Sequence, residues 1–155
     1  MSVAGVAMLL TGGRLLGSTG EAESEVSVIE VTAPGIGEEI TVGGFTVTVT
    51  SFDCEPDDDV ASATPVQRCE ASLQVRNDRF AVRSFPGSLQ RVTDGFRRFS
   101  PSKLHSVHAM APASVDPGAV EQVDLVYHVP GTLAPSRLEL RESTRQAPVQ
   151  VLLRA

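Results

Sequence analysis

The 155-residue chain contains no tryptophan, one tyrosine and a single lysine, and it has only two cysteines. Antibody-type domains place a tryptophan between their two sheets, so its absence excludes the standard version of that domain. The two Gly-Gly pairs are not followed by Lys and Ser or Thr, which excludes a phosphate-binding loop of the nucleotide-binding type. Nucleotide-driven chemistry is therefore not expected.

Long hydrophobic runs are also missing. The longest run near the start covers residues 3–10, whereas a membrane-spanning helix needs about 20 residues. Small residues at 18–20 follow it, as they do at signal-peptidase sites, and residues 1–20 are interpreted as a truncated signal or membrane-targeting segment. A disordered or weakly helical tail is the alternative, so N-terminal membrane association stays open. Ser18 stands where lipidation would require a cysteine.

Most of the net charge of −6 is concentrated near the N-terminus. Residues 21–36 contain four glutamates and no basic residue, and they are interpreted as an acidic linker to a domain at 37–155. From residue 40 onward the acidic and basic residues nearly balance. A nucleic-acid surface needs a concentration of positive charge, so nucleic acid is not an expected partner.

Cys54 and Cys69 are separated by a polar segment that holds Asp57, Asp58 and Asp59. This spacing is neither a CxxC redox motif nor part of a Cys/His cluster. We predict a disulfide that closes a loop between two strands, which would place the protein in an oxidising compartment. Two unrelated buried thiols are the alternative.

Alternation of apolar and polar residues predicts a series of short strands. In 45–49 apolar residues at odd positions alternate with threonines, and 69–76 and 123–129 follow the same pattern. Phe52 breaks the parity set by the odd positions, so either a β-bulge or the end of the strand is expected near Ser51. Further strands are predicted at 39–42, 89–92, 96–99, 137–141 and 149–153.

Turn residues separate these strands. Asp94-Gly95 is a strong hairpin signal, because both residues tolerate positive φ, and further turns are expected at 116–118 and 130–131. No amphipathic helix of useful length is evident. The pattern predicts an all-β fold, an Ig-like antiparallel β-sandwich of about seven to nine strands behind a non-globular N-terminal segment.

The order of these motifs resembles a known group of domains. Residues 37–49 (GEEITVGGFTVTV), 73–77 (LQVRN), 94–96 (DGF), 116–118 (DPG) and 126–130 (VYHVP) carry the resemblance. Together they are similar to the telokin-like Ig-like domain of unknown function in bacterial lipoproteins and secreted proteins. A mycobacterial secreted immunogenic antigen is related to that group.

The resemblance implies an antiparallel sandwich outside the cytoplasm, with no catalytic residues to carry over. Asn77 matches the group's strand-end asparagine, Gly95 its hairpin glycine and Pro117-Gly118 its turn, all of which are structural positions. The long segment 100–113 and the missing lipidation cysteine depart from the usual pattern.

One concentration of basic residues is a candidate binding site. Arg97 and Arg98 lie between Phe96 and Phe99, and Arg91, Arg83 and Lys103 lie nearby. The functional interpretation is a docking patch for an acidic partner or anionic head groups, formed by Arg91, Arg97, Arg98 and Lys103. The structural alternative is a solvated strand edge, whose charges discourage pairing with other sheets.

Catalytic and metal-binding interpretations have weaker support. His105 and His108 could bind a metal together with an acidic residue, but a zinc site needs three or four converging ligands. Ser106 lies between the two histidines, but no nucleophile-elbow motif surrounds it. His128 has Asp124 four residues before it on a predicted strand. The three consecutive aspartates at 57–59 lack the further ligands of a calcium loop, so a solvated loop is predicted. We predict no cofactor and no metal.

The sequence therefore predicts an extracytoplasmic, non-catalytic binding or interaction module at the bacterial cell envelope. Its partner would be an unidentified protein or envelope component, and its oligomeric state is open. A structural spacer and a metal-dependent hydrolase that uses His105 and His108 are the alternative hypotheses.

Overall fold

A computed structural model describes residues 32–102 and 113–154. One compact unit begins at Ala33. The predictions for residues 1–20, for most of the acidic linker, and for Lys103, His105, Ser106 and His108 lie outside the described residues.

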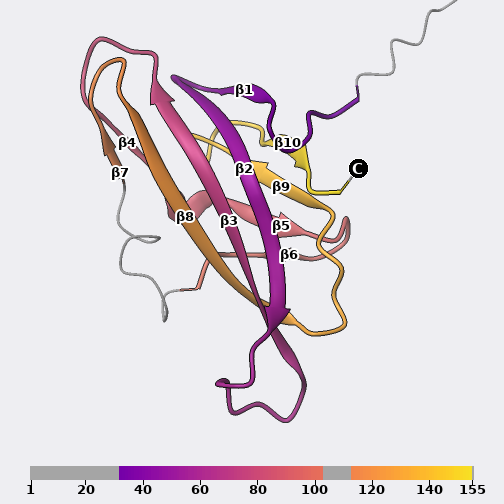
Figure 1. The fold of residues 1–155 in the computed structure, drawn as a ribbon. Coiled ribbons are helices and arrows are strands. Elements are labelled where there is room, and N and C mark those ends of the chain that lie inside the picture. The colour runs from indigo at the N-terminus through magenta and orange to yellow at the C-terminus, as the bar shows by residue number, and fades with distance from the viewer. Residues whose placement is uncertain (1–31, 103–112, 155) are drawn as a thin grey trace, which may run out of the picture. The chain divides into compact units, whose positions relative to one another are not determined.

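The first sheet contains the long strands that alternation predicts. Its order is β1-β2-β3-β8, and every neighbouring pair is antiparallel (Figure 1). The apolar side chains at alternate positions point inward and are buried, whereas the threonines and charged residues between them point outward. The bounds are Glu39–Val42 for β1, Phe45–Pro56 for β2, Val66–Asn77 for β3 and Val120–Pro130 for β8.

A β-bulge divides β2. Val49 pairs with Leu73, but the next pair is Ser51 with Ser72, so Thr50 is the extra residue. Beyond the bulge the even positions face inward, and Cys54 lies directly opposite Cys69. The two cysteines form a disulfide. Of the two alternatives expected near Ser51, the structure has the bulge, and β2 continues beyond it. The predicted disulfide is confirmed.

The second sheet consists of short strands in the order β10-β9-β5-β6. Figure 1 shows β9, β5 and β6 behind the long strands of the first sheet. The bounds are Val149–Leu152 for β10, Arg137–Leu140 for β9, Arg91–Thr93 for β5 and Arg98–Phe99 for β6.

Two predicted strands in this sheet have wrong boundaries. The strand predicted at 89–92 begins at Arg91, because Gly87–Leu89 forms a 3₁₀ turn in which the Leu89 amide donates to the Pro86 carbonyl at 3.0 Å. The strand predicted at 96–99 begins at Arg98, because Asp94 holds the two preceding amides in the turn.

A third, two-stranded sheet was not predicted. It pairs β4, Arg83–Phe85, with β7, Ala113–Val115. Three-residue strands are too short to show alternation, so the sequence pattern does not reveal them. The described residues therefore contain ten strands, whereas about seven to nine were predicted.

The core lies between the two main sheets. It combines inward residues of β2, β3 and β8 with those of β5, β9 and β10, and Phe45 meets Phe85 edge to face at 5.5 Å between ring centroids. The predicted all-β sandwich is confirmed. In the part of the chain that the structure describes, no helix is long and apolar enough to cross a bilayer.

Candidate binding surface

The outer side of the second sheet gathers basic residues from distant parts of the chain. In one row across the sheet, Gln150 pairs with Glu139 and Glu139 pairs with Arg91. Directly paired residues point to the same side, so all three lie on one face. In the next row, Arg137 of β9 and Arg98 of β6 flank Thr93. We call the surface formed by Arg91, Arg98, Arg137, Glu139 and Gln150 the arginine face.

Glu139 lies at the centre of this face. Its side chain is only 1% exposed, although it is on the outer side of the sheet. The Arg98 Nε donates to Glu139 Oε2 at 2.8 Å, and Gln150 Nε2 donates to the other oxygen at 3.4 Å. A buried carboxylate needs such partners, because water no longer solvates its charge. The hydrogen bond and charge of Glu139 raise the pKa of Arg98, which therefore stays cationic.

The three arginines of the face keep donors that face solvent. Arg98 uses Nε, and its side chain is 61% exposed. Arg137 donates through Nη1 to Gln150, and Arg91 donates through Nη1 to the Ser88 carbonyl. Among the described residues, the other guanidinium nitrogens of these arginines have no partner. Guanidinium groups suit carboxylates and phosphates, whose paired oxygens match the geometry of the fork.

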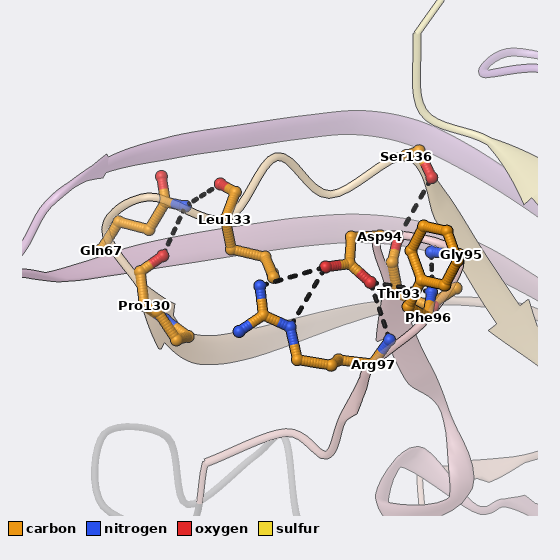
Figure 2. A network of polar contacts seen from close by, with 9 residues as sticks. All are labelled: Gln67, Thr93, Asp94, Gly95, Phe96, Arg97, Pro130, Leu133 and Ser136. Atoms are coloured by element: carbon orange, nitrogen blue, oxygen red, sulfur yellow. Dashed lines mark hydrogen bonds and ion pairs between the residues drawn. The ribbon is translucent and has the colours of Figure 1, made fainter.

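The β5–β6 hairpin extends from the edge of this face, and Asp94 fixes its tip (Figure 2). Asp94 Oδ1 accepts hydrogen bonds from the amides of Phe96 at 2.9 Å and Arg97 at 2.7 Å. The Arg97 side chain returns to Oδ2 through Nε and Nη2. Gly95 has a φ of 103°, a conformation that few other residues adopt. The predicted hairpin turn is confirmed.

These contacts also set the charge of the tip. The backbone hydrogen bonds from Arg97 and Phe96 favour the ionised carboxylate, and they lower the pKa of Asp94 below its usual value. The guanidinium of Arg97 acts in the same direction. The Asp94 carboxyl group is therefore ionised at neutral pH.

Phe96 occupies the tip itself and is 94% exposed. Its amide is fixed by Asp94, so the ring is presented to solvent by a backbone of defined conformation. An exposed aromatic side chain beside arginines is characteristic of residues that dominate binding energy at protein interfaces. Phe80, in the loop that follows β3, is exposed to a similar extent.

The loop between β8 and β9 supports the hairpin (Figure 2). The Ser136 amide donates to the Thr93 carbonyl at 2.9 Å, at the base of the tip. The Ser136 hydroxyl donates to the same carbonyl at 3.4 Å, as Figure 2 shows. At the start of the loop, Gln67 Nε2 of β3 donates to the carbonyls of Pro130 and Leu133. The hairpin is therefore tied, through this loop, to the first sheet.

The predicted docking patch falls partly on this surface. Arg91 and Arg98 belong to the arginine face, and Arg97 lies at the adjoining hairpin tip, whereas Lys103 lies outside the described residues. Sequence reasoning missed Arg137 and Glu139 as members of the site. Their alternation with Leu138 and Leu140 placed them on an outer face, but nothing local indicated that β9 pairs with β5.

The other candidate residues form no comparable site. His128 Nε2 lies 2.9 Å from Asp57 Oδ2 and does not pair with Asp124, whose carboxylate accepts from Ser72. The Asp57 side chain is only 8% exposed, so the prediction of a solvated loop is wrong for this residue. In the described ranges, no three His, Cys, Asp or Glu side chains are grouped as metal ligands.

The outer face of the first sheet has a shallow hollow next to the disulfide. Ser51, Asp53 and Glu55 of β2 line it together with Arg68, Glu70 and Ser72 of β3. Arg68 pairs with Glu70 at 2.7 Å and with Glu55 at 3.7 Å, whereas Asp53 lies directly opposite Glu70. This hollow is acidic overall, in contrast to the arginine face.

Comparison with solved structures identifies relatives in fold. MPT63, a secreted protein from Mycobacterium tuberculosis, is 14% identical with a TM-score of 0.57, over 80% of this chain and 97% of that protein. The yjhA protein from Bacillus subtilis is 14% identical with a TM-score of 0.56, over 78% and 99%. A functionally unknown protein from Listeria monocytogenes EGD-e is 9% identical with a TM-score of 0.52, over 73% of each chain.

These likenesses confirm the fold that the resemblance predicted, an Ig-like β-sandwich shared with a mycobacterial secreted protein. At such low identity they establish the fold and not a function. No family model matches the chain, and no curated protein matches its sequence.

Proposed function

We propose that this protein is an extracytoplasmic, non-catalytic binding module at the bacterial cell envelope, and that the arginine face and the hairpin tip form its binding surface. The single observation that carries the proposal is Phe96, which is 94% exposed on a hairpin whose conformation Asp94 fixes. A hydrophobic side chain of this size gains free energy when a partner covers it. Because the turn is already ordered, little conformational entropy is lost on binding.

The proposed compartment has two supports. The Cys54–Cys69 disulfide would persist in an oxidising environment. The likeness to a secreted protein concerns the fold and agrees with this location. A thiol-alkylation experiment on freshly lysed cells that naturally make the protein tests the compartment. Protein that takes up a thiol reagent only after reduction is expected, and alkylation of both cysteines without reductant would contradict export.

Site-specific crosslinking tests the binding function even though the partner is unidentified. A photo-reactive benzoylphenylalanine is placed at position 96 in one variant and at position 80 in a matched control. Both positions carry exposed phenylalanines in loops. We expect a discrete adduct from position 96 in intact cells and none from position 80. Absence of any adduct at position 96 would refute a binding role for this surface.

A structural spacer is the second candidate function, and one observation favours it. Arg97 and Arg98 each pair with an acid of this domain, Asp94 and Glu139, so part of the positive charge already serves the fold. A spacer predicts that Arg137→Gln and Phe96→Ala leave cellular function unchanged, provided that the variants fold. A binding module predicts that at least one of them impairs it.

A further inference from the structure

The partner of the arginine face can be specified further, by an argument that rests on the proposed function. We propose that the arginine face binds an acidic polypeptide segment in an extended conformation, with two carboxylates on the arginines and an apolar side chain against Phe96.

The rows of the sheet match the repeat of an extended chain. Arg91 and Thr93 are two residues apart on β5, so their rows are separated by about 6.6 Å. Alternate side chains of an extended peptide repeat at the same distance of about 6.6 Å. A peptide that lies along β5 therefore presents one side chain at Arg91. The side chain two positions farther along the peptide then lies at the row of Thr93.

The row of Thr93 offers two guanidinium groups to one carboxylate. Thr93 is 3% exposed and lies between Arg137 on one neighbouring strand and Arg98 on the other. Strands in a sheet are about 4.8 Å apart, so these two arginines start about 10 Å apart and can converge on one group above Thr93. Arg98 keeps its Nε on Glu139, and both of its Nη atoms remain available among the described residues.

The hairpin tip determines which end of the segment carries the apolar side chain. Continuing along β5, the next step after Thr93 reaches Gly95 and the exposed ring of Phe96. The favoured ligand therefore has the pattern acidic-x-acidic-x-apolar, read in either chain direction. Because guanidinium groups bind carboxylates through paired hydrogen bonds, aspartate or glutamate suits the first two positions.

A polypeptide fits better than a membrane surface. Anchoring in a bilayer needs several apolar side chains that reach below the head groups, beside the basic residues. Among the described residues of β5, β6, β9 and their hairpin tip, Phe96 is the one large apolar side chain that is strongly exposed. Arginine and an aromatic residue in one patch are instead the composition enriched at protein interfaces.

The experiment is an NMR titration of the ¹⁵N-labelled full chain with a peptide of sequence SETETLS at low salt. The reversed sequence is also used, and a peptide in which glutamine replaces glutamate is the control. We expect either acidic peptide to shift the amides of Arg91, Phe96 and Arg137 and to leave that of Phe80 unchanged. Raising the salt to about 0.5 M should weaken binding at least several-fold.

Two pairs of variants locate the site. Arg137→Gln should weaken binding about five-fold, whereas Arg79→Gln, the same change in the loop after β3, should alter it less than two-fold. Phe96→Ala should weaken binding about five- to ten-fold, and Phe80→Ala should have no effect. Arg98 is left unchanged, because its loss would leave Glu139 buried without its cation. The spectrum of each variant verifies its fold.

Three results would overturn this proposal. They are equal binding of the glutamine peptide, no shift from either acidic peptide at about 1 mM, and binding only to vesicles of phosphatidylglycerol and phosphatidylcholine. The last result would assign the face to membranes. A crosslinked adduct from position 96 together with any of these results would retain the binding function and reject the acidic peptide.

Discussion

The first sheet contains three strands of eleven or twelve residues, whereas no strand of the second sheet is longer than four residues. Both sheets contribute apolar side chains to one core. The long strands carry the disulfide and the bulge, and the short strands carry the arginine face. In this domain the sheet with the more extensive pairing supports the fold, and the proposed binding surface lies on the other sheet.

The outer faces of the two sheets also differ in charge. On the first sheet, acidic residues outnumber basic ones, whereas three arginines surround one carboxylate on the second. The acidic residues of the first sheet's outer face are Glu39, Asp53, Glu55, Glu70 and Asp124, and its basic residues are Arg68 and Arg76. A chain with a net charge of −6 therefore displays a basic face, which total charge alone would not indicate.

The largest expected effect compares the cores of the two sheets. Leu73 of β3 and Leu138 of β9 are both fully buried. Replacing either by alanine should cost about 2–5 kcal/mol of unfolding free energy. We expect Leu73→Ala to cost more, because its long neighbouring strands cannot move into the cavity. Denaturant unfolding measures both values, and a larger loss for Leu138→Ala would reverse the roles assigned to the sheets.

Removing the disulfide should have the second-largest effect, a loss of stability in the first sheet. Cys54 and Cys69 are separated by 15 positions, and closing such a loop stabilises a protein by about 3 kcal/mol in the chain-entropy model. Replacing both by alanine avoids a buried hydroxyl at Cys69, which is fully buried. The variant should have a lower midpoint denaturant concentration for unfolding than the oxidised wild type. Adding reductant should lower the midpoint of the wild type and leave that of the variant unchanged. Equal midpoints would show that strand pairing alone sets the stability.

Asn77 connects the end of β3 with the small third sheet. Its fully buried side chain donates to the carbonyls of Ala81 at 2.8 Å and Val115 at 2.9 Å, and it accepts from the Arg79 amide. Asn77→Ala should cost about 1–3 kcal/mol, because it leaves buried backbone groups without partners. Asn77→Asp, which keeps the acceptor and loses the donors, should also destabilise. Hydrogen exchange at Val115 reports the local loss, and unchanged exchange would contradict this role.

Substitution of Tyr127 by phenylalanine should not destabilise the folded protein. Its hydroxyl is buried and has no hydrogen-bond partner among the described residues, and burial raises its pKa, opposed by the charge of Arg91. Tyr127→Phe removes an unsatisfied polar group, so stability should stay equal or rise by about 1 kcal/mol. Thermal unfolding measures the difference. A loss of more than about 1 kcal/mol would mean that the hydroxyl is hydrogen-bonded in solution.

The smallest effect concerns the hairpin tip and its pH dependence. The pKa of Asp94 is lowered in the folded protein. The ionised carboxylate therefore stabilises the folded state fully above the ordinary carboxyl pKa of 3.8, and this stabilisation is lost as the pH falls through the lower pKa of the folded state. The amides of Phe96 and Arg97 should therefore shift with a midpoint below 3.8. A ¹⁵N NMR titration of wild type and Asp94→Asn tests this. A midpoint at or above the ordinary value would contradict the proposed rigidity of the tip.

The first sheet could be predicted from sequence because its information is local. Alternation in β2, β3 and β8 extends over many residues, and the change of parity at Phe52 located the bulge that brings Cys54 opposite Cys69. The Asp94-Gly95 turn was also evident, because the conformation of Gly95 and the capping by Asp94 depend on neighbouring residues.

The candidate site could be predicted only in part, for the same reason. Arg91, Arg97 and Arg98 are neighbours in sequence, and they suggested a patch. Arg137 and Glu139 join it because β9 pairs with β5 across more than 40 residues of chain, and no local pattern specifies that pairing. The burial of Glu139 follows from the same pairing. The hydrogen bond from Arg98 Nε to the Glu139 carboxylate also depends on it.

Thr50, the extra residue in β2, has a consequence for how this chain tolerates changes in length. Up to Val49 the odd-numbered residues face inward, and from Phe52 onward the even-numbered ones do. Deleting Thr50 would leave one uninterrupted ladder in which Phe52 and Cys54 keep their partners on β3, whereas a deletion within β3 would turn part of that strand over. Homologous chains should therefore lose a single residue at this point more readily than elsewhere in the long strands.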